Sequence, residues 1–432
     1  MIDTLNKDFT KIFHHSGKIY KSGGIINLIG EYTNFCKTPI IAGVTDKYIF
    51  TKIKLNIGNI VKVYSCNLHS YYEFPLKDCE NLGKLKDPIN SKNPKQKWIL
   101  YIFRLCQEFL NRGYKLKGFD AAFIGNIPFR AGMSSSTALI STFACAINNL
   151  QNFKIHKKEL FVILQECEKD LYKKGIDKKG GWNNISPFIS LHAKQNNLIF
   201  FDSDILKYKY IPFEISKYHL LIVDTSNNYD RNAPIYDDIS NSCNMVLKCV
   251  QKRFGNNIES LTDANISMVK TVKRRITKKD FLRAEYVINE KQRIQETLNA
   301  LSTNDFETIG KLMYEDYYCL KNLYKTQREK LDYLMFIAKR SRVTGARPMN
   351  REAGGSTINL VRELYYNRFI SYVNTFFYEK FKYKPSIYEV SLIQGTHEIN
   401  IHNNKNLKKL KFLTLNTIKG FSLKRKILTN KN

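Results

Sequence analysis

The sequence lacks paired cysteines and long apolar runs. Its nine cysteines are scattered from Cys36 to Cys319 without short paired spacings. Such an odd, scattered set is typical of reduced intracellular thiols and argues against a disulfide framework or a cysteine-based zinc site. No uninterrupted apolar run reaches the roughly 18 residues that a membrane helix needs, and residues 1–24 lack the apolar core of a secretory signal. We therefore expect a cytoplasmic protein without a membrane segment.

Acidic residues are few relative to basic ones. The chain has 39 Asp and Glu against 69 Lys and Arg, a formal charge of +30 in 432 residues. A charge of this size can indicate a polyanion partner. The lysines are spread along the chain, however, without an RNP-type aromatic motif, a zinc finger or a basic heptad array. We interpret the charge as a residue bias that favours anionic ligands such as phosphates, and we expect no specific nucleic-acid binding.

The order of local patterns predicts a mixed α/β protein. No repeat of about 20–50 residues occurs, which excludes a solenoid, and the length suits one or two domains with full cores. Short β-branched or aromatic runs predict strands over 40–53, 60–66, 119–124, 197–202, 219–224, 356–361 and 388–392. Apolar residues at helical spacing predict helices over 97–112, 139–147, 237–253, 279–301, 305–323 and 326–341. This order places a domain boundary near residues 205–220.

Three segments rich in glycine or serine stand out. Residues 23–35 read GGIINLIGEYTNF, and residues 344–357 read TGARPMNREAGGST, a glycine-bearing loop that enters a predicted strand. Residues 125–139, GNIPFRAGMSSSTAL, follow a predicted strand and open a predicted helix. Backbone N–H groups at such a helix N-terminus can cradle a phosphate, and a serine hydroxyl there can reach Mg²⁺. The segment is not a Walker A loop, because it lacks Gly-Lys-Ser/Thr, and taken alone it also suits a plain helix N-cap.

In this order and spacing, the three segments resemble those of the GHMP small-molecule kinases, and among them the galactokinases. The first is similar to P-G-R-V-N-L-I-G-E-H-T-D-Y, the second to P-x-G-x-G-L-S-S-S-A, and the third to G-A-R-M-T-G-x-G-F-G-G-C. The resemblance covers about residues 15–395. It implies an α/β fold with a ribosomal-S5-like N-terminal domain over 1–210, a ferredoxin-like C-terminal domain over 211–402, and a basic tail over 403–432. The site would lie between the two domains.

The resemblance also implies a nucleotide site for ATP and Mg²⁺. Gly132, Ser134, Ser135 and Ser136 match the family's phosphate loop. Ser136 and Glu168 match the magnesium ligands. Trp98 and Tyr101 lie where the family places residues near the adenine pocket. Arg130 departs from the pattern, because the family has glycine there.

The sugar side departs further from the family. Glu31 and Tyr236 match sugar-contacting residues, but Tyr32 replaces a histidine and Asn34 replaces an aspartate. The family's catalytic arginine falls on Ile25. With residues 188–191 (FISL) as the anchor, its catalytic aspartate falls on Ser186. In the third segment, residues 350–352 (NRE) replace small residues.

These departures leave two functions open. The first is an ATP-dependent kinase for galactose or a related monosaccharide, expected to be a monomer. The second is a catalytically degenerate homologue, a pseudoenzyme that binds nucleotide or sugar as a sensor or partner protein. Loss of a general base typically lowers a rate by about 10²–10⁴, and an isoleucine supplies no charge to the transferred phosphate. Asp177, in an apparent insert over residues 173–184, is an alternative base.

Overall fold

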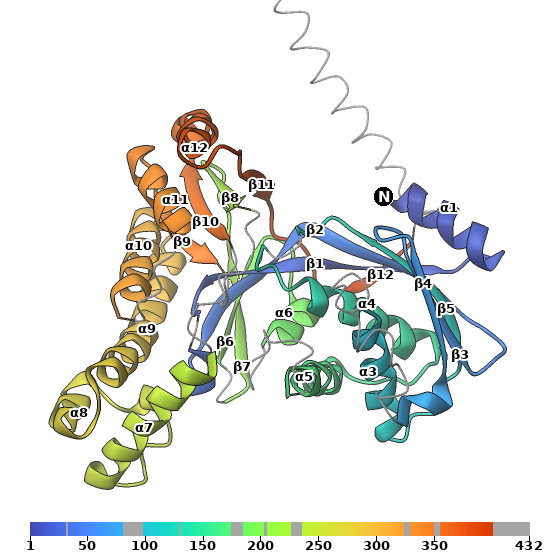
Figure 1. Ribbon diagram of the computed structural model, residues 1–432, viewed down its shortest axis with the longest axis horizontal. Helices are drawn as coiled ribbons and strands as arrows, with labels where there is room; N and C mark the ends of the chain where they lie inside the picture. Colours follow the sequence, from blue (N-terminus) through green and yellow to red (C-terminus); the bar gives the residue numbers. More distant parts are fainter. Residues whose placement is uncertain are drawn as a thin grey trace, which may run out of the picture.

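The computed structural model describes residues 1–31, 33–80, 98–128, 131–173, 185–202, 205–225, 236–323, 329–349 and 355–400. Two β-sheets lie side by side, and each is flanked by helices (Figure 1). This arrangement confirms the predicted α/β fold class. Among the described residues, no helix combines the length and the apolar character that a membrane crossing needs.

The first sheet has eight strands along the order β12-β1-β2-β5-β3-β4, with β6 pairing to β2 and β7 to β6. Their bounds are β1 Lys18–Ile29, β2 Ile40–Leu55, β3 Ile60–Ser65, β4 Ser70–Pro75, β5 Phe119–Gly125, β6 Asn197–Asp202, β7 Lys207–Pro212 and β12 His397–Ile399. The pairing of β3 with β5 is parallel, and the other pairings are antiparallel. The last described strand, β12, therefore returns to the first sheet and pairs with β1 at the edge of that sheet.

Apolar side chains on both faces of this sheet are buried, because successive residues of a strand point to opposite faces. In β2, Ile49 and Ile53 belong to one hydrophobic cluster, whereas Phe50 belongs to another. The first cluster is covered by α3 Trp98–Asn111, α4 Ser135–Leu150, α5 Lys157–Lys173 and α6 Ser186–His192. The opposite face is covered by α1 Ile2–Phe13, which buries Leu5 and Phe9. Successive side chains of a strand point to opposite faces, so each apolar run finds a partner on both sides.

The second sheet is antiparallel, in the order β11-β8-β10-β9. Its strands are β8 Tyr218–Asp224, β9 Gly345–Met349, β10 Ser356–Arg362 and β11 Ser386–Val390. One face packs against α11 Glu329–Arg340 and α12 Tyr366–Phe381. The other face packs against α9 Lys278–Ser302, α10 Phe306–Asn322 and the ends of β1, β2 and β6. A single hydrophobic cluster therefore joins the two sheets.

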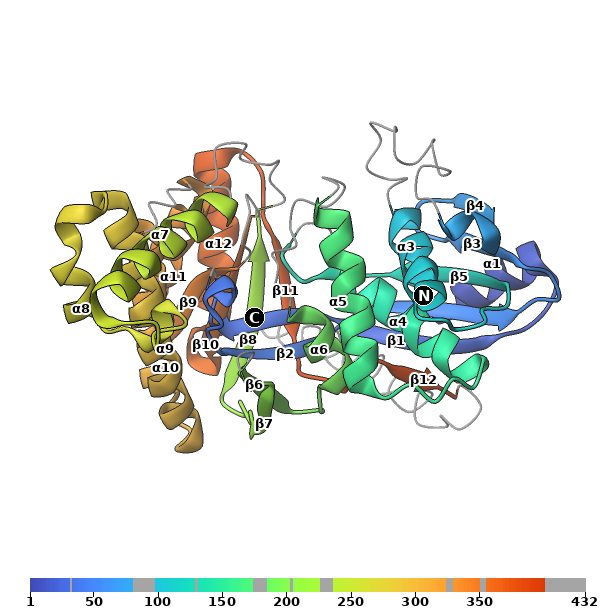
Figure 2. The same cartoon turned by 90° about the horizontal axis from the view of Figure 1, so that it is seen from below.

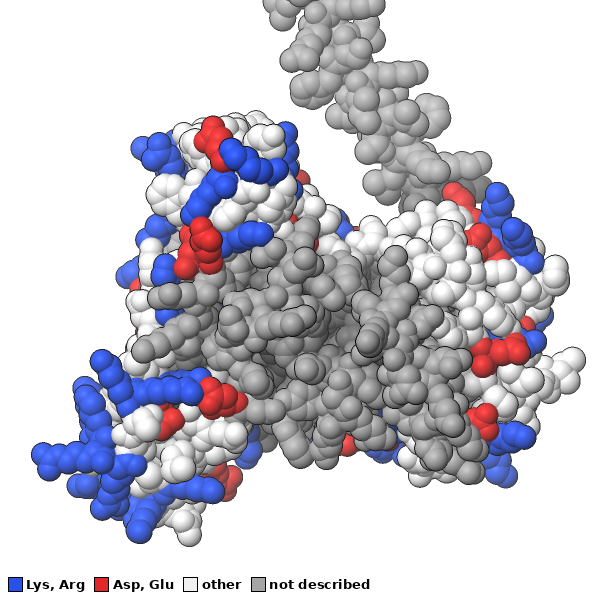
Figure 3. Space-filling model, in the orientation of Figure 1, with Lys and Arg blue, Asp and Glu red and all other residues white. Residues whose placement is uncertain are grey.

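A small helical lobe projects from α9. It consists of α7 Tyr236–Phe254, α8 Ile266–Thr271 and the short turns between α7 and α9, packed around Cys243, Val246 and Val250. Figure 3 shows lysine and arginine side chains gathered over this lobe. Nine exposed cations lie there: Lys248, Lys252, Arg253, Lys270, Lys273, Arg274, Arg275, Lys278 and Lys279. The basic charge is therefore denser here than an even spread along the chain would give.

Most predicted elements are present, with ends shifted by a few residues. One expectation was wrong: the first half of the segment over residues 344–357 is strand β9, not a loop. β9 pairs with β10 along its length, and Ala346 lies opposite Asn359. It is the edge strand of its sheet, a position that tolerates Pro348.

Candidate active site

The predicted phosphate loop connects β5 to α4. Gly132 and Ser134 have positive φ angles of 79° and 50°, and α4 begins at Ser135. A left-handed backbone is uncommon for a residue other than glycine, so the chain turns sharply just before the helix. Ser134, Ser135 and Ser136 are all half-buried around this turn. The first N–H groups of α4 have no partner within the helix, which is the arrangement that binds phosphate in other proteins.

The predicted metal ligand Glu168 lies beside the first turn of α4. It is on α5, only 2% exposed, and its Oε1 accepts a hydrogen bond of 2.6 Å from Thr137 Oγ1. Thr137 directly follows Ser136 in the chain. Among the described residues, no group of three or more His, Cys, Asp or Glu side chains could hold a metal by itself. One glutamate beside a serine suits Mg²⁺, which keeps several waters and takes further ligands from substrate phosphates.

The two positions where the family has its catalytic pair both contact this loop. Ser186 opens α6, and its Oγ lies 3.3 Å from Ser134 Oγ. Ile25, on β1, donates its backbone N–H to the Met133 carbonyl at 2.9 Å. Its side chain is 3% exposed and belongs to the core of the first sheet. The structure therefore brings residues 25, 134 and 186 together, with the Ser186 hydroxyl at the position predicted for a carboxylate and the apolar Ile25 side chain at the position predicted for a guanidinium.

The predicted sugar residues are described only in part. Glu31 follows the end of β1 and is 5% exposed. Its Oε1 accepts from Asn27 Nδ2 at 3.3 Å and lies 3.8 Å from Arg347 Nη1, while Oε2 makes no hydrogen bond to the described residues. Tyr32 lies outside the described residues, as do the side chains of Asn34 and Tyr236. Outside them too lie Arg130, Asp177 and residues 350–352.

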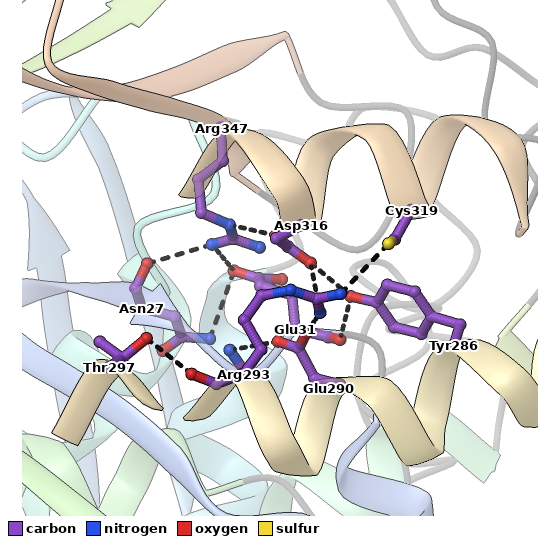
Figure 4. A network of polar contacts seen from close by, with 10 residues as sticks. Asn27, Glu31, Tyr286, Glu290, Arg293, Thr297, Asp316, Cys319 and Arg347 are labelled. Carbon is purple, nitrogen blue, oxygen red and sulfur yellow. Dashed lines mark hydrogen bonds and ion pairs between the residues drawn. The ribbon is translucent and has the colours of Figure 1, made fainter. Parts of the chain in front are cut away.

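Behind Glu31 is a network of buried charges that the sequence analysis missed (Figure 4). Arg347, on β9, donates from Nε to Asp316 Oδ2 at 2.5 Å, and Arg293 pairs with Glu290. Three carboxylates (Glu31, Glu290 and Asp316) therefore face two guanidinium groups in this network. Burial, together with the nearby Asp316, raises the pKa of Glu290 to about 8. Burial disfavours the charge of Arg347, but Asp316 and Glu31 raise its pKa above the ordinary value.

The two predicted adenine-pocket residues differ in solvent exposure. Trp98 begins α3, is 9% exposed, and packs edge-on against Tyr72 and Phe123. Its Nε1 donates to Ser70 Oγ at 3.3 Å. Tyr101, one turn later, is half-buried, and its backbone carbonyl accepts from Cys167 Sγ at 3.6 Å. This contact ties α3 to the part of α5 that carries Glu168.

Comparison with known proteins finds sequence relatives among the galactokinases. Residues 100–190 match the family model described as the GHMP kinases N terminal domain. The chain is 26% identical to a galactokinase of Thermotoga neapolitana over 382 residues, which are 88% of this chain and 99% of the relative. It is 27% identical to a galactokinase of Clostridium acetobutylicum over 406 residues, 93% of this chain and 100% of the relative.

Solved structures show the same fold. The crystal structure of Lactococcus lactis galactokinase complexed with galactose superimposes with a TM-score of 0.81 at 23% identity, over 92% of this chain and 100% of that one. The Methanococcus jannaschii mevalonate kinase gives a TM-score of 0.60 at 17% identity, over 88% and 99% of the two chains. The resemblance inferred from the three segments is therefore confirmed across both sheets.

Proposed function

Because this chain is homologous to galactokinases over most of its length and has the GHMP kinase fold, we propose that it is an ATP-dependent sugar kinase. It phosphorylates a hydroxyl of galactose or a closely related monosaccharide. The observation that carries the proposal is the meeting of distant segments at one loop. Ile25 bonds to Met133, Ser186 lies against Ser134, and Glu168 lies beside the first turn of α4. These contacts bring a candidate phosphate cradle close to β1, the strand that Glu31 follows.

On the nucleotide side, Ser134, Ser135 and Ser136 would hold the ATP phosphates at the N-terminus of α4. Ser136 and Glu168 would hold Mg²⁺, which when bound neutralises phosphate charge. The partial positive charge of the helix N-terminus supports the same role. Tyr101 and Trp98 would lie near the adenine, and Tyr101 is the more accessible of the two.

On the sugar side, Glu31 would accept a hydrogen bond from a sugar hydroxyl. Its Oε2 makes no hydrogen bond to the described residues, so this oxygen can accept one from a sugar hydroxyl. A carboxylate that accepts from a hydroxyl forms one of the stronger neutral-to-ion hydrogen bonds. We propose Tyr32, Asn34 and Tyr236 as the other sugar contacts, following their positions in the family's segments.

Proton transfer is where this site departs from the family. Ser186 cannot act as a carboxylate base at neutral pH, so the rate would depend on positioning and on electrostatic stabilisation of the transferred group. The hydroxyls of Ser134 and Ser186 can orient the acceptor hydroxyl, or Asp177 can take its proton. The alternative of a degenerate sensor protein has no support in the fold or in the comparisons.

The direct test is ADP release by the purified protein with magnesium-ATP, first with galactose and then with a panel of monosaccharides. We expect sugar-dependent turnover. A general base typically contributes about 10²–10⁴ to such a rate, so the turnover number indicates whether another group in this site takes the proton. Absence of sugar-dependent ADP release across the panel would contradict the proposal. Binding of sugar or nucleotide measured on the same sample would then identify a binding protein.

A second test changes the position of the family's aspartate. In an active site that uses another proton acceptor, Ser186→Asp brings a carboxylate near the transferred phosphate, so turnover should stay level or fall. Ser186→Ala is the matched control, because it changes the same side chain without adding charge. A rise of about 10²–10⁴ in Ser186→Asp would mean that the native chain lacks a base. Asp177→Asn then tests the alternative acceptor, which an unchanged rate would eliminate.

A further inference from the structure

The network behind Glu31 joins both sheets through buried side chains. Figure 4 shows them converging from the end of β1, from α9 and α10, and from β9. Arg347 is completely buried, yet it is charged. A buried guanidinium is costly unless it is paired and hydrogen-bonded. The residues that pair with Arg347 therefore show which elements its side chain holds together.

Arg347 holds Glu31 in place from one side. It donates from Nη1 to the Asn27 carbonyl at 3.2 Å and lies 3.8 Å from Glu31 Oε1. The Asn27 amide donates to the same Glu31 oxygen. The Arg347 guanidinium thus fixes the backbone at Asn27 and attracts the Glu31 carboxylate. The Asn27 side chain binds the same carboxylate. Asp316 holds the other edge of the guanidinium.

Helix α9 fixes the backbone around Glu31. Tyr286 donates its hydroxyl to Asp316 Oδ1 at 2.7 Å and contacts the Glu31 carbonyl at 3.2 Å. Glu290 accepts from the Gly30 N–H at 2.9 Å. Gly30 has a φ of 97°, and a Cβ there would lie 2.9 Å from the Pro39 carbonyl oxygen. The backbone on either side of Glu31 is therefore held by polar contacts, at the Gly30 N–H and at the Glu31 carbonyl.

We propose that Arg347 is a positioning residue for the sugar site. Together with Asp316 and Tyr286, it holds the Glu31 carboxylate so that one oxygen is engaged and Oε2 is left for a sugar hydroxyl. This inference rests on the proposed kinase function and deepens it. It assigns the arginine of the third segment to sugar recognition, at a distance from the nucleotide loop. It also predicts that the network affects the sugar and the nucleotide unequally.

The test compares steady-state constants for sugar and ATP in variants of the full chain. Arg347→Lys keeps the charge but loses the planar fork, so the KM for sugar should rise roughly 10- to 100-fold, the effect of losing a hydrogen bond to a charged group. The KM for ATP should stay within about twofold. Tyr286→Phe removes only one hydroxyl and should shift the sugar KM in the same direction. Sugar affinity measured at equilibrium should follow the same order.

Tyr317→Phe is the matched control, because Tyr317 also donates to a carboxylate, that of Asp332 at 2.8 Å, but outside the network. It should leave the sugar KM unchanged. The proposal is overturned if Tyr286→Phe and Tyr317→Phe behave alike, or if Arg347→Lys changes both KM values equally. If Arg347→Lys does not fold, Tyr286→Phe against Tyr317→Phe decides. A wild-type protein that neither binds nor phosphorylates any sugar would instead overturn the proposed function and this inference with it.

Discussion

Glu290 shows how an imbalance of buried charge can be relieved by a proton. Among the described residues, its carboxylate lies with those of Glu31 and Asp316 near two guanidinium groups. In this described set one negative charge is in excess, and it is buried, where an unbalanced charge is most costly. Protonation of Glu290 removes the excess. This is the physical reason for its raised pKa of about 8.

This shift predicts a pH dependence of stability. The pKa of Glu290 rises from 4.5 to about 8 on folding, so the folded protein holds a proton that the unfolded chain loses between these values. The stabilisation is complete below pH 4.5 and is lost as the pH rises through about 8. Glu290→Gln cannot titrate, so its urea midpoint should fall less between pH 5 and about 8.5 than that of the wild type. Equal pH slopes in the two proteins would show that Glu290 stays ionised in the fold.

At the scale of elements, two glycines allow α10 to lie directly on β9. A Cβ on Gly310 would come within 2.1 Å of the Thr344 carbonyl oxygen, and one on Gly345 within 2.4 Å of Gly310 Cα. Asp316 follows Gly310 along α10, and Arg347 follows Gly345 along β9. The close approach of the two elements therefore brings this buried ion pair within hydrogen-bond distance.

Gly310→Ala should separate the helix from the strand. We expect a loss of about 1–3 kcal/mol in the free energy of unfolding, the usual effect of overpacking a core, together with a raised KM for sugar. Gly58→Ala is the control, because a Cβ there meets no heavy atom closer than 4.0 Å. Urea unfolding and sugar kinetics on both variants provide the measurement. A Gly310→Ala protein as stable as Gly58→Ala would show that α10 moves aside without cost.

Several elements with a clear period could be predicted from the sequence, whereas short edge strands could not, and α1, β1 and α5 were not predicted either. The helix over 279–301 and the strand over 356–361 have apolar residues at regular spacing, and both are present as α9 and β10. Strand β7 has mostly exposed residues, and β9 has only five, including a proline. Neither offers the alternation by which a strand is found. The positions of these edge strands depend on partners elsewhere in the chain.

The same distinction applies to the site. Gly132, the three serines and Glu31 could be proposed as site residues because they lie within recognisable segments. The network could not, because Arg347 meets Asn27 across 320 positions and Glu290 meets Gly30 across 260. No local pattern records such a pairing. The available local signal was that Arg347 stands at the arginine of the G-A-R sequence in the third segment.

At the scale of the whole molecule, the two sheets share a hydrophobic cluster. It includes Ile26 and Ile41 from the first sheet, Ile222 and Ile358 from the second, and Leu298 from α9. Any large rotation of one sheet against the other would expose this apolar surface to water, at a cost of about 25 cal/mol per Å². Figure 2 shows β1 and β2 running from one helical layer towards the other. Glu31, at the end of β1, therefore has its position set by both halves.

The return of β12 to the first sheet has a consequence for how the protein is made. Tyr20 donates its hydroxyl to Glu398 at 3.0 Å, and the two residues are 378 positions apart. On the ribosome, β1 emerges early, and its outer edge at residues 19–21 stays unpaired until residues 397–399 have been synthesised. An open strand edge is a template for wrong pairing with other chains. For most of its translation the nascent chain therefore carries an unfinished sheet with an open edge at β1.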